Sequence, residues 1–543
     1  MKAIQDFSFL GTGDDIKGEV YEIFLKNTLR GDLDQYFTPR EIVEFMVKFS
    51  DPGKGTCIVD PACGSGGFLI QSFRHVNQKI IDAGGSETER RERFRTPVDN
   101  CLWGQEADYD LHVLAKINLI MHGDGWNSVF QGDSLNTDDL PDNRFDLVLT
   151  NPPFTIRYEY QDVLSRYELG IGRDSQELDL LFVEKGIRSL KAGGDLYIVL
   201  PEGMLNNARY LDFRLWLFNR CHMLMVVSLP QQAFQPFGKS VSKTCILGVR
   251  KKTASDRFDQ PPRFVFACNA EKIGYECGKK TYKAIEENDL LDCLAHSRAH
   301  FDGVRTLTAG GECGWIPSER MTERRIDARS LLNMADRARM AATHATLVRL
   351  GEVCKVENRR VKPAPHKYYN YLEVPQITEH TGTVTNVVQR RGNGFVSETY
   401  NFVTGGDLLF VRINPRLNRV ALLPDGVSET LVSDEVYRLV MEPNPHIQSP
   451  AVLAAVLRST HVKKQMERIA TGSSSSRARV QPEDLLNEVF IPVPPASVQR
   501  KIETQSARQI QAYWKAAQEY LKHHLEIQEQ LDSHYDPDTF KRV

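Results

Sequence analysis

A glycine-rich turn behind a short apolar run is the feature of this 543-residue chain that most limits its possible folds. The run CIVD at 57–60 ends in an aspartate, and the turn that follows, PACGSGG at 61–67, leads into a helical stretch. Glycines let the backbone approach a ligand closely, and the N-terminus of a helix supplies free N–H donors and positive charge. The pattern is typical of a nucleotide-cofactor turn, although Leu69 stands where a dinucleotide-binding turn has its last glycine.

Short apolar runs alternate with helical stretches between about residues 56 and 250, which predicts βαβ units around a mostly parallel sheet. We expect strands at 57–60, 102–106, 145–150, 196–201, 223–230 and 244–249. We expect helices from Gly67 to about Ala83, from Asp108 to about Met121 and from Asp179 to about Leu190, preceded by helical structure over 14–48. The first half of the chain is therefore predicted to have a Rossmann-like α/β fold.

The length of the chain exceeds what a single hydrophobic core can fill, so several domains are expected. The periodicity weakens over 251–345, which we interpret as a junction, and short strand-like runs return between Leu347 and Val493. We therefore expect an N-terminal helical segment, a first α/β domain, a second, mixed α/β domain and a long C-terminal helix. Their expected bounds are 1–50, 51–315, 316–495 and 496–543.

Charge and cysteine spacing exclude several classes of protein. The formal net charge is -3 and the pI is near 6.6, so any contact with nucleic acid must come from local basic patches. The ten cysteines contain no CxxC pair or zinc-like cluster, so no metal site is expected. No apolar run has the length of a signal peptide or a membrane span, and we expect a cytoplasmic protein without a membrane partner.

Carboxylates follow three successive predicted strands. Asp60 ends the first strand, Glu106 ends the second, and Asp133 lies in the turn QGDSL at 131–135. A Rossmann-type sheet places a carboxylate such as Glu106 on the ribose hydroxyls, and Asp133 could accept a hydrogen bond from an adenine amino group. Any one of them alone would usually be a solvated loop residue, but the three together predict one crevice at the carboxyl edge of the sheet.

The sequence NPPF at 151–154 follows the apolar strand FDLVLT directly. Consecutive prolines fix the backbone and remove its donors, so the local carbonyl groups are left as acceptors. The Asn151 side-chain oxygen and the Pro152 carbonyl could accept hydrogen bonds from an amino group and make it more nucleophilic, while Phe154 could stack on a planar base. An isolated Asn-Pro-Pro could also be a rigid turn; its position downstream of the glycine turn favours the catalytic interpretation.

Taken together, these motifs resemble the N6-adenine DNA methyltransferases, and most closely the modification subunits of type I restriction-modification systems. The similar segments run in order through nearly all of residues 12–250. They are YFTPREIVEFMV at 36–47, VDPACGSGGFL at 59–69, GQEADYDLHVLAKINLIMHG at 104–123, GDSL at 132–135, NPPF at 151–154, DLLFVEKGIRSLKAGGDLYIVLPEGML at 179–205 and SLPQQAFQPFGKSVSKTCIL at 228–247.

The resemblance implies S-adenosylmethionine as the cofactor and direct methyl transfer to N6 of an adenine flipped out of double-stranded DNA. It implies cofactor contacts from Phe37, Thr38, Pro39, Asp60, Ala62, Gly64, Gly66, Gly67, Phe68, Glu106, Asp133 and Ser134. It places the flipped adenine and the catalytic role on Asn151, Pro152, Pro153 and Phe154. Neither a metal ion nor a covalent enzyme intermediate is required.

The C-terminal half more loosely resembles one target-recognition unit of the type I specificity subunits, followed by a spacer helix. Basic residues in its turn-rich segments suit contact with phosphates and guanines, although basic clusters are more generally solvated surface. The candidate DNA-binding residues are Arg359, Arg360, Lys362, Arg390, Arg391, Arg412, Arg416, Arg419, Arg477 and Arg479. The serine run at 473–476 could order on DNA.

Specificity subunits carry two recognition units, whereas this chain carries one. An apolar stripe along 496–531 therefore predicts a homodimer joined through antiparallel helices, reading two inverted half-sites. The alternative is that this helix folds back on its own domain.

The sequence leaves other functions to consider. The chain could be a non-catalytic DNA-recognition or assembly subunit, which the intact Asn151 and Asp60 disfavour; any DNA cleavage would belong to a separate restriction subunit. The run AFQPFGKS at 233–240 approaches a phosphate-binding loop, but a predicted strand follows it where that loop requires a helix.

Overall fold

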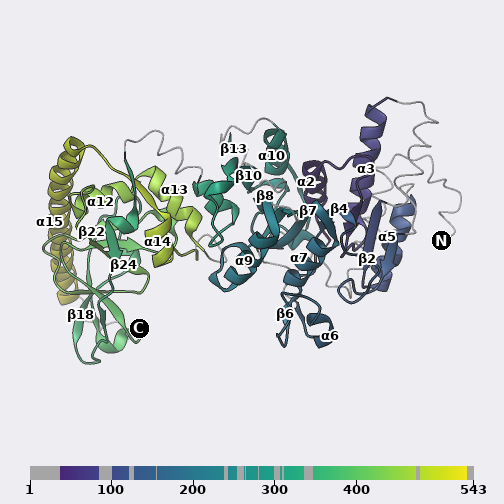
Figure 1. The fold of residues 1–543 in the computed structure, drawn as a ribbon. Helices are drawn as coiled ribbons and strands as arrows, with labels where there is room; N and C mark the ends of the chain where they lie inside the picture. Colours follow the sequence, from purple (N-terminus) through teal and green to yellow (C-terminus); the bar gives the residue numbers. More distant parts are fainter. Residues whose placement is uncertain are drawn as a thin grey trace. The chain divides into compact units, whose positions relative to one another are not determined.

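The computed structural model describes residues 37–84, 101–121, 128–154, 156–237, 243–253, 262, 264–278, 281–298, 306–307, 311–334, 346–471 and 477–534. The chain divides into two compact units, Met1–Ala335 and Asp336–Val543, and each is described by itself (Figure 1). The part of the expected N-terminal helical structure before residue 37 lies outside the described residues. The serine run at 473–476 lies outside them too. Among the described helices, none combines the length and the apolar character needed to cross a bilayer.

A ten-stranded sheet forms the centre of the first unit, in the order β13-β14-β10-β8-β9-β7-β4-β1-β2-β3. Its strands are β1 Ile58–Asp60, β2 Leu102–Glu106, β3 Val129–Gln131, β4 Phe145–Thr150, β7 Leu190–Pro201, β8 Cys221–Ser228, β9 Thr244–Lys251, β10 Phe264–Asn269, β13 Thr306–Leu307 and β14 Glu312–Pro317. Strand β1 pairs in parallel with both β2 and β4, whereas β9 is antiparallel to β7 and β8. The strand order therefore reverses between β1 and β4, which is where α/β sheets of this kind open a crevice.

Helices cover both faces of this sheet. Alternate residues of β7 point to opposite faces: Leu196 and Ile198 pack in the core beneath α7 (Leu178–Ser189) and α9 (Leu211–Arg220). Tyr197 and Val199 pack in the core shared with α2, α3 and α10. These helices are α2 Arg40–Ser50, α3 Gly67–Asp82 and α10 Asp289–Arg298, and α5 spans Tyr109–Met121. The near-continuous apolar strands follow from burial on both faces, and the prediction of a Rossmann-like α/β fold is confirmed.

The sheet continues beyond the point where the sequence suggested a junction. Strand β10 adds to β8 in parallel and β14 adds to β10 in antiparallel register, so the expected boundary between 315 and 316 would cut β14. The chain after β14 stays with this unit, because buried Arg214 donates hydrogen bonds to the carbonyls of Glu323 and Arg324 at 2.6 and 2.7 Å. Ile326 is also fully buried there. The division after Ala335 replaces the expected one.

The second unit is a mixed α/β domain, as predicted. One sheet has the order β16-β24-β21-β22 and another the order β17-β20-β23-β18-β19. Their strands are β16 Cys354–Val356, β17 Arg360–Val361, β18 Tyr368–Leu372, β19 Val388–Arg391, β20 Tyr400–Val403, β21 Leu408–Val411, β22 Val420–Leu422, β23 Thr430–Val432 and β24 Val436–Met441. The short pair β15 Leu347–Arg349 and β25 Phe490–Pro492 and the helices α12 Pro450–Leu457, α13 Thr460–Ile469 and α14 Pro482–Glu488 complete it.

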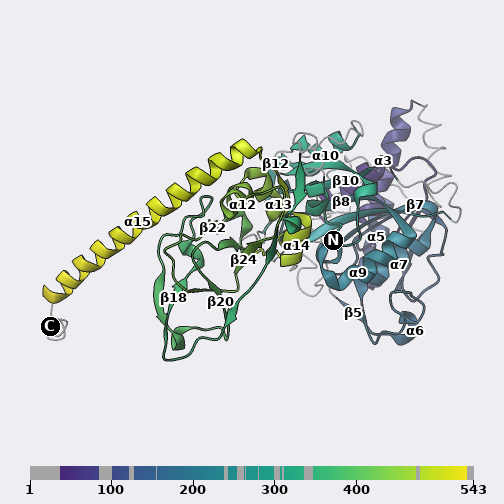
Figure 2. The same ribbon diagram turned by 60° about the vertical axis from the view of Figure 1, so that its left-hand side comes forward.

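The C-terminal helix α15, Ala496–His534, begins on the second unit and then leaves its surface (Figure 2). Ile502 packs against the core around α12, and Trp514 packs against the core that contains β21. Tyr520 is 74% exposed and Ile527 is 54% exposed. The first part of α15 thus folds back on its own domain, while its second part presents apolar side chains that the described residues of the chain do not cover.

Candidate active site

The carboxyl ends of four neighbouring strands bring together the residues predicted to form the site. The loops after β1, β2, β3 and β4 leave the same edge of the sheet because these strands are parallel. They carry Asp60 with the glycine turn, Glu106, Asp133 and Asn151. The site therefore lies at the reversal of strand order between β1 and β4.

The glycine turn is built by backbone conformations that favour glycine. Gly66 has φ 85° and is the N-cap of α3, and Gly64 has φ 52°. The Cys63 N–H donates to the Gln105 carbonyl at 2.9 Å, which ties the turn to β2. Gly67 opens the helix, whereas Phe68 packs in the core. The turn thus places the N-terminus of a sixteen-residue helix at the carboxyl edge of the sheet.

Two buried carboxylates flank this turn. The Asp60 Oδ1 accepts a hydrogen bond from the Ala62 N–H at 3.0 Å, and Asp60 is 1% exposed. Burial, with a smaller contribution from the nearby Glu106 carboxylate, raises the pKa of the Asp60 carboxyl to about 7. The Glu106 Oε2 and Oε1 accept from the N–H groups of Gly64 and Asp108 at 2.8 and 2.9 Å. Burial also raises the pKa of Glu106.

The turn after β3 is fastened to the turn after β1. The Ser134 hydroxyl donates to the Pro61 carbonyl at 2.7 Å and is buried, so its observed contact is structural. The Asp133 Oδ1 accepts from the Leu135 N–H at 3.0 Å, and its Oδ2 accepts from the Tyr158 hydroxyl. Both oxygens of Asp133 are therefore held in place by protein donors.

The first and last motifs of the site meet at Asn151. Its Nδ2 donates to the Thr38 Oγ1 at 2.9 Å, across 113 positions of sequence. Its Oδ1 is buried and has no hydrogen-bond partner among the described residues. Pro39, beside Thr38, is buried as the N-cap of α2, while Phe37 is half-buried. One amide thus joins the FTP and NPPF segments and keeps a free acceptor.

The aromatic ring of the NPPF segment is covered in this structure. Phe154 is 4% exposed, and its ring lies 5.7 Å from the Phe234 ring in a T-shaped arrangement. Pro152 is buried and Pro153 is half-buried. Stacking of a base on Phe154 would need part of this ring to become accessible.

Two residues of the site were missed from the sequence. Tyr158 bonds to Asp133, and Phe234 packs on Phe154. Tyr158 lies outside every motif that was quoted, and Phe234 lies in the run that resembled a phosphate-binding loop. Within the described part of that run, Gln235–Phe237 form a 3₁₀ turn, and β9 begins at Thr244. Only the tertiary fold brings these side chains to the crevice.

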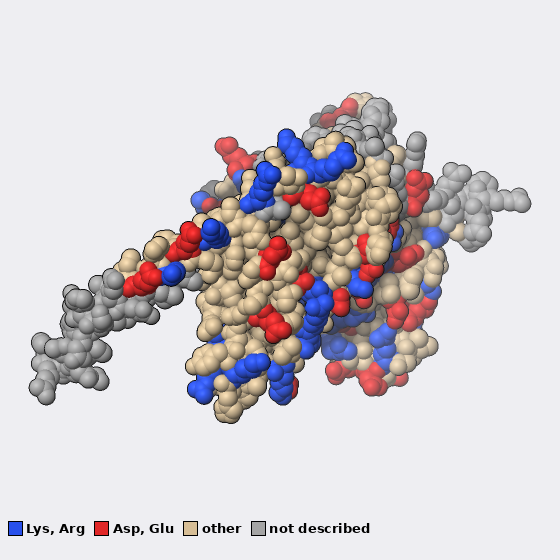
Figure 3. Space-filling model, turned by 90° about the vertical axis from the view of Figure 1, so that its left-hand side faces the viewer, with Lys and Arg blue, Asp and Glu red and all other residues tan. Residues whose placement is uncertain are grey.

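Of the ten candidate DNA-binding residues, six form ion pairs with acidic residues of the second unit and four form none with the described residues. Four of these pairs have partly buried arginines, with side chains 15–35% exposed: Arg390 with Glu373, Arg412 and Arg479 with Glu435, and Arg419 with Glu379. Arg360 lies 3.8 Å from Asp434 at the surface. Lys362 is paired with Glu398 on the surface. Arg359, Arg391, Arg416 and Arg477 are exposed and carry no ion pair with the described residues. Figure 3 shows Lys and Arg in separate groups among acidic residues rather than in one continuous band.

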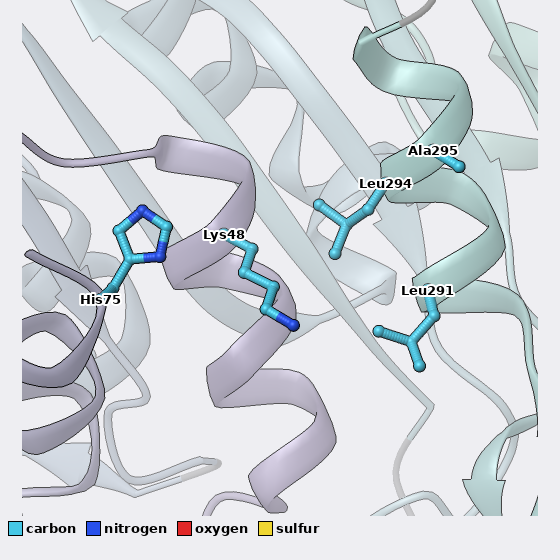
Figure 4. A pocket seen from close by; sticks show the side chains of 5 residues that line it. All are labelled: Lys48, His75, Leu291, Leu294 and Ala295. Atoms are coloured by element: carbon cyan, nitrogen blue, oxygen red, sulfur yellow. The ribbon is translucent and has the colours of Figure 1, made fainter. Parts of the chain in front are cut away.

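A hollow in the first unit contains none of the predicted site residues. It is lined by Lys48, His75, Leu291, Leu294 and Ala295, from α2, α3 and α10 (Figure 4). His75 is bonded to Asp51 at 2.8 Å and Lys48 to Glu44 at 2.5 Å. The residues predicted to form the site lie at the strand ends, and none of them lines this hollow.

Comparison with known proteins agrees with the motifs. The chain is 29% identical over 224 residues to the methylase subunit of the type I restriction enzyme EcoEI from Escherichia coli, covering 40% of this chain and 44% of that one. It is 27% identical over 234 residues to the type II restriction enzyme and methyltransferase RM.BcgI from Heyndrickxia coagulans, covering 42% and 33%. The chain thus spans less than half the length of these relatives.

A solved type I restriction-modification methyltransferase subunit from Streptococcus thermophilus superposes with a TM-score of 0.43 at 21% identity, covering 59% of this chain and 63% of that one. The family model of the N-6 DNA methylases matches residues 12–300, which is more than half of the chain. The match includes the strand ends with Asp60, Glu106, Asp133 and Asn151. The protein belongs to the N-6 DNA methylase family.

Proposed function

We propose that this chain is a site-specific DNA methyltransferase that transfers a methyl group to N6 of a flipped-out adenine in double-stranded DNA. The observation that carries the proposal is the buried Oδ1 of Asn151, which has no hydrogen-bond partner among the described residues. A buried acceptor without a partner is costly, so its retention indicates a ligand donor in the working state. An adenine amino group is such a donor.

The residues at the strand ends fit S-adenosylmethionine. Bound there, this cofactor would supply an electrophilic methyl group on a sulfonium. The buried Asp60 and Glu106 carboxylates favour a cationic ligand, and the turn at Gly64–Gly67 allows close approach of its backbone. Ala62, Ser134 and Phe68 support this wall of the crevice, while Phe37, Thr38 and Pro39 close it next to Asn151. Direct transfer needs no metal ion, and no cluster of metal-ligating side chains occurs among the described residues.

Asn151 acts on the incoming amino group in this proposal. Its Oδ1 and the Pro152 carbonyl accept hydrogen bonds from the amino hydrogens, which raises the electron density available on nitrogen. The donated bond from Nδ2 to Thr38 fixes the orientation of the amide, so the acceptor rather than the donor faces the base. Pro153 stiffens the loop and Phe154 supplies an aromatic wall.

Substitution of Asn151 tests the catalytic proposal. Asn151→Ala should lower the methyl-transfer rate at least about a hundredfold, since one preorganised group of this kind is worth that much in other enzymes, while cofactor affinity stays within about twofold. Asn151→Asp, which keeps an acceptor, should retain more activity than the alanine variant. Sequencing of N6-methyladenine in DNA, with titration calorimetry for the cofactor, gives both readouts. Undiminished methylation by Asn151→Ala would refute the assignment, and a wild-type chain that binds DNA without methylating it would favour a non-catalytic recognition subunit.

The second unit is proposed to recognise the DNA target, with Arg359, Arg391, Arg416 and Arg477 as its principal contacts. Their guanidinium groups are exposed and unpaired among the described residues, so phosphate or guanine contacts would break no internal ion pair. A separate restriction subunit is a further proposed partner, because the Escherichia coli relative is the methylase subunit of a type I restriction enzyme.

The free part of α15 supports a homodimer. Tyr513, Tyr520 and Ile527 are exposed and recur every seven residues, the spacing of a coiled-coil seam. Removal of the whole helix would also remove Trp514 from its own domain, so substitutions are the better test. Tyr520→Glu with Ile527→Glu should convert a dimer to a monomer in light scattering, whereas Gln518→Glu, on the opposite side of the helix, should not. A dimer mass that survives both glutamates would refute this interface.

A further inference from the structure

A segment between the NPPF loop and α7 is fastened to the turn after β3. It contains β5 (Arg157–Tyr158), α6 (Gln161–Leu164) and β6 (Gln176–Glu177), and β5 pairs with β6. The Tyr167 hydroxyl donates to the Leu135 carbonyl at 3.0 Å, and the Tyr158 hydroxyl donates to the Asp133 Oδ2. Two tyrosines of one segment therefore hold one turn of the cofactor wall.

This segment is itself firmly anchored. The Glu184 carboxylate of α7 accepts from the N–H groups of Glu168 and Leu169, each at 2.8 Å, and Tyr167 is 3% exposed. The contact to Asp133 thus comes from a packed scaffold. A contact of this kind can fix the orientation of a side chain.

The Tyr158 hydroxyl remains a donor throughout the physiological pH range. Burial and the Asp133 carboxylate both raise the pKa of Tyr158. Asp133 accepts one hydrogen bond at each oxygen, from Leu135 N–H and from Tyr158. A carboxylate oxygen has two lone pairs, so each oxygen can still accept one more donor.

We propose that Tyr158 is a positioning residue for recognition of the cofactor's adenine ring, acting by fixing the Asp133 carboxylate. The inference rests on the proposed function and on the expectation from the sequence that Asp133 accepts a hydrogen bond from the adenine amino group of the cofactor. Tyr158 follows Asn151 by seven positions, so the same stretch of chain carries the acceptor for the target base and the support for the cofactor base. A fixed carboxylate accepts from the 6-amino group of adenine and opposes the 6-oxo group of hypoxanthine.

Tyr158→Phe removes only the hydroxyl, and Tyr160→Phe is its matched control. The Tyr160 ring packs 5.2 Å from the Tyr158 ring, but its hydroxyl has no partner among the described residues, and the residue is 71% exposed. Calorimetry of the full chain would compare S-adenosylhomocysteine with its inosine analogue. We expect Tyr158→Phe to bind the adenosyl ligand about tenfold more weakly, the range of one hydrogen bond to a charged group, and to lose most of the preference over the inosyl ligand.

The kinetic expectation is a raised KM for the cofactor with little change in kcat, and a melting temperature near that of Tyr160→Phe. The inference is overturned if Tyr158→Phe keeps the affinity and the base preference of Tyr160→Phe. It is also overturned if the two ligands weaken equally, since that result describes a purely structural role. Failure of the proposed function would look different: the wild-type chain would bind neither ligand.

Discussion

Asp60 and Glu106 are acids that the fold holds in a place unfavourable to their charge. Both sit at strand ends behind the glycine turn, and burial raises the pKa of each. Carboxyl groups with a raised pKa often occur at functional sites. A bound cation would stabilise the charged carboxylate and so offset the loss of hydration that burial causes. At this scale the sequence predicted that these residues meet at one edge of the sheet, because strand ends and glycine turns are local signals. Their roles in binding and catalysis stay predictions. The sequence could not predict Tyr158 or Phe234, which reach the crevice only through tertiary packing.

Asp60 gives the stability of the chain a particular dependence on pH. The folded pKa of about 7 exceeds the ordinary value of 3.8, so the folded state holds this proton more tightly than the unfolded state. Its contribution to stability is fully present below about pH 4 and is lost as the pH rises through about 7. Asp60→Asn, which keeps Oδ1, should therefore raise the free energy of unfolding at about pH 8 by up to ~4 kcal/mol, and much less at about pH 5.

Urea unfolding at both pH values measures this effect. Asp82→Asn, at an exposed position at the end of α3, should change neither value by more than about 0.5 kcal/mol. Equal changes for Asp60→Asn at the two pH values would contradict the raised pKa.

Exposed and paired arginines of the second unit should differ in their contribution to DNA binding. Arg416→Ala removes a guanidinium that has no ion pair with the described residues, so it should weaken binding and reduce the slope of log K against log salt by about 1. Arg419, paired with Glu379 at 3.0 Å and 15% exposed, serves as the control, and Arg419→Ala should leave that slope unchanged. Fluorescence anisotropy over a range of salt concentrations measures both slopes. Equal slopes for the two variants would contradict the distinction between exposed and ion-paired arginines.

Secondary-structure elements were predicted from the sequence wherever local patterns identify them. The expected strands at 102–106 and 145–150 match β2 and β4, and α3 spans nearly the expected range. The extension of the sheet by β10 and β14 was not predicted, because the two strands are far apart in the sequence and no local pattern specifies their pairing. The interpretation of 251–345 as a junction was therefore wrong for the part that ends in β14 and the buried Ile326.

Helix α9 makes the contact that keeps this extension in the first unit. Arg214 is 1% exposed and also donates to the carbonyls of Met204 and Asn207 at 3.0 and 2.9 Å. Arg214→Met should lower the free energy of unfolding by about 3–5 kcal/mol, because it leaves four carbonyls without their donor. Arg209→Met, at a side chain that is 60% exposed, should cost less than about 1 kcal/mol. An equal loss of unfolding free energy in the two variants, measured by chemical denaturation, would show that the hydrogen bonds of Arg214 are unimportant for stability.

The whole molecule consists of two units with separate hydrophobic cores. Because each unit buries its own core, fragments 1–335 and 336–543 should each unfold cooperatively when expressed alone. The first fragment should bind the cofactor, and the second should bind DNA without methylating it. Calorimetry and DNA binding of the two fragments test this, and a fragment ending at residue 315, which cuts β14, should be much less stable. A cooperative transition in that shorter fragment equal to that of 1–335 would contradict the boundary.

The hydrogen bond from Asn151 to Thr38 has a consequence for folding as well as for chemistry. It closes a loop of more than a hundred positions, so the segments that carry Thr38 and Asn151 meet only after the entropic cost of closing that loop has been met. A ligand of the crevice then binds only the native state and stabilises it by mass action, by about 2.7 kcal/mol at a hundredfold excess over its Kd. The supply of cofactor would accordingly regulate how long the protein survives, in addition to how fast it works.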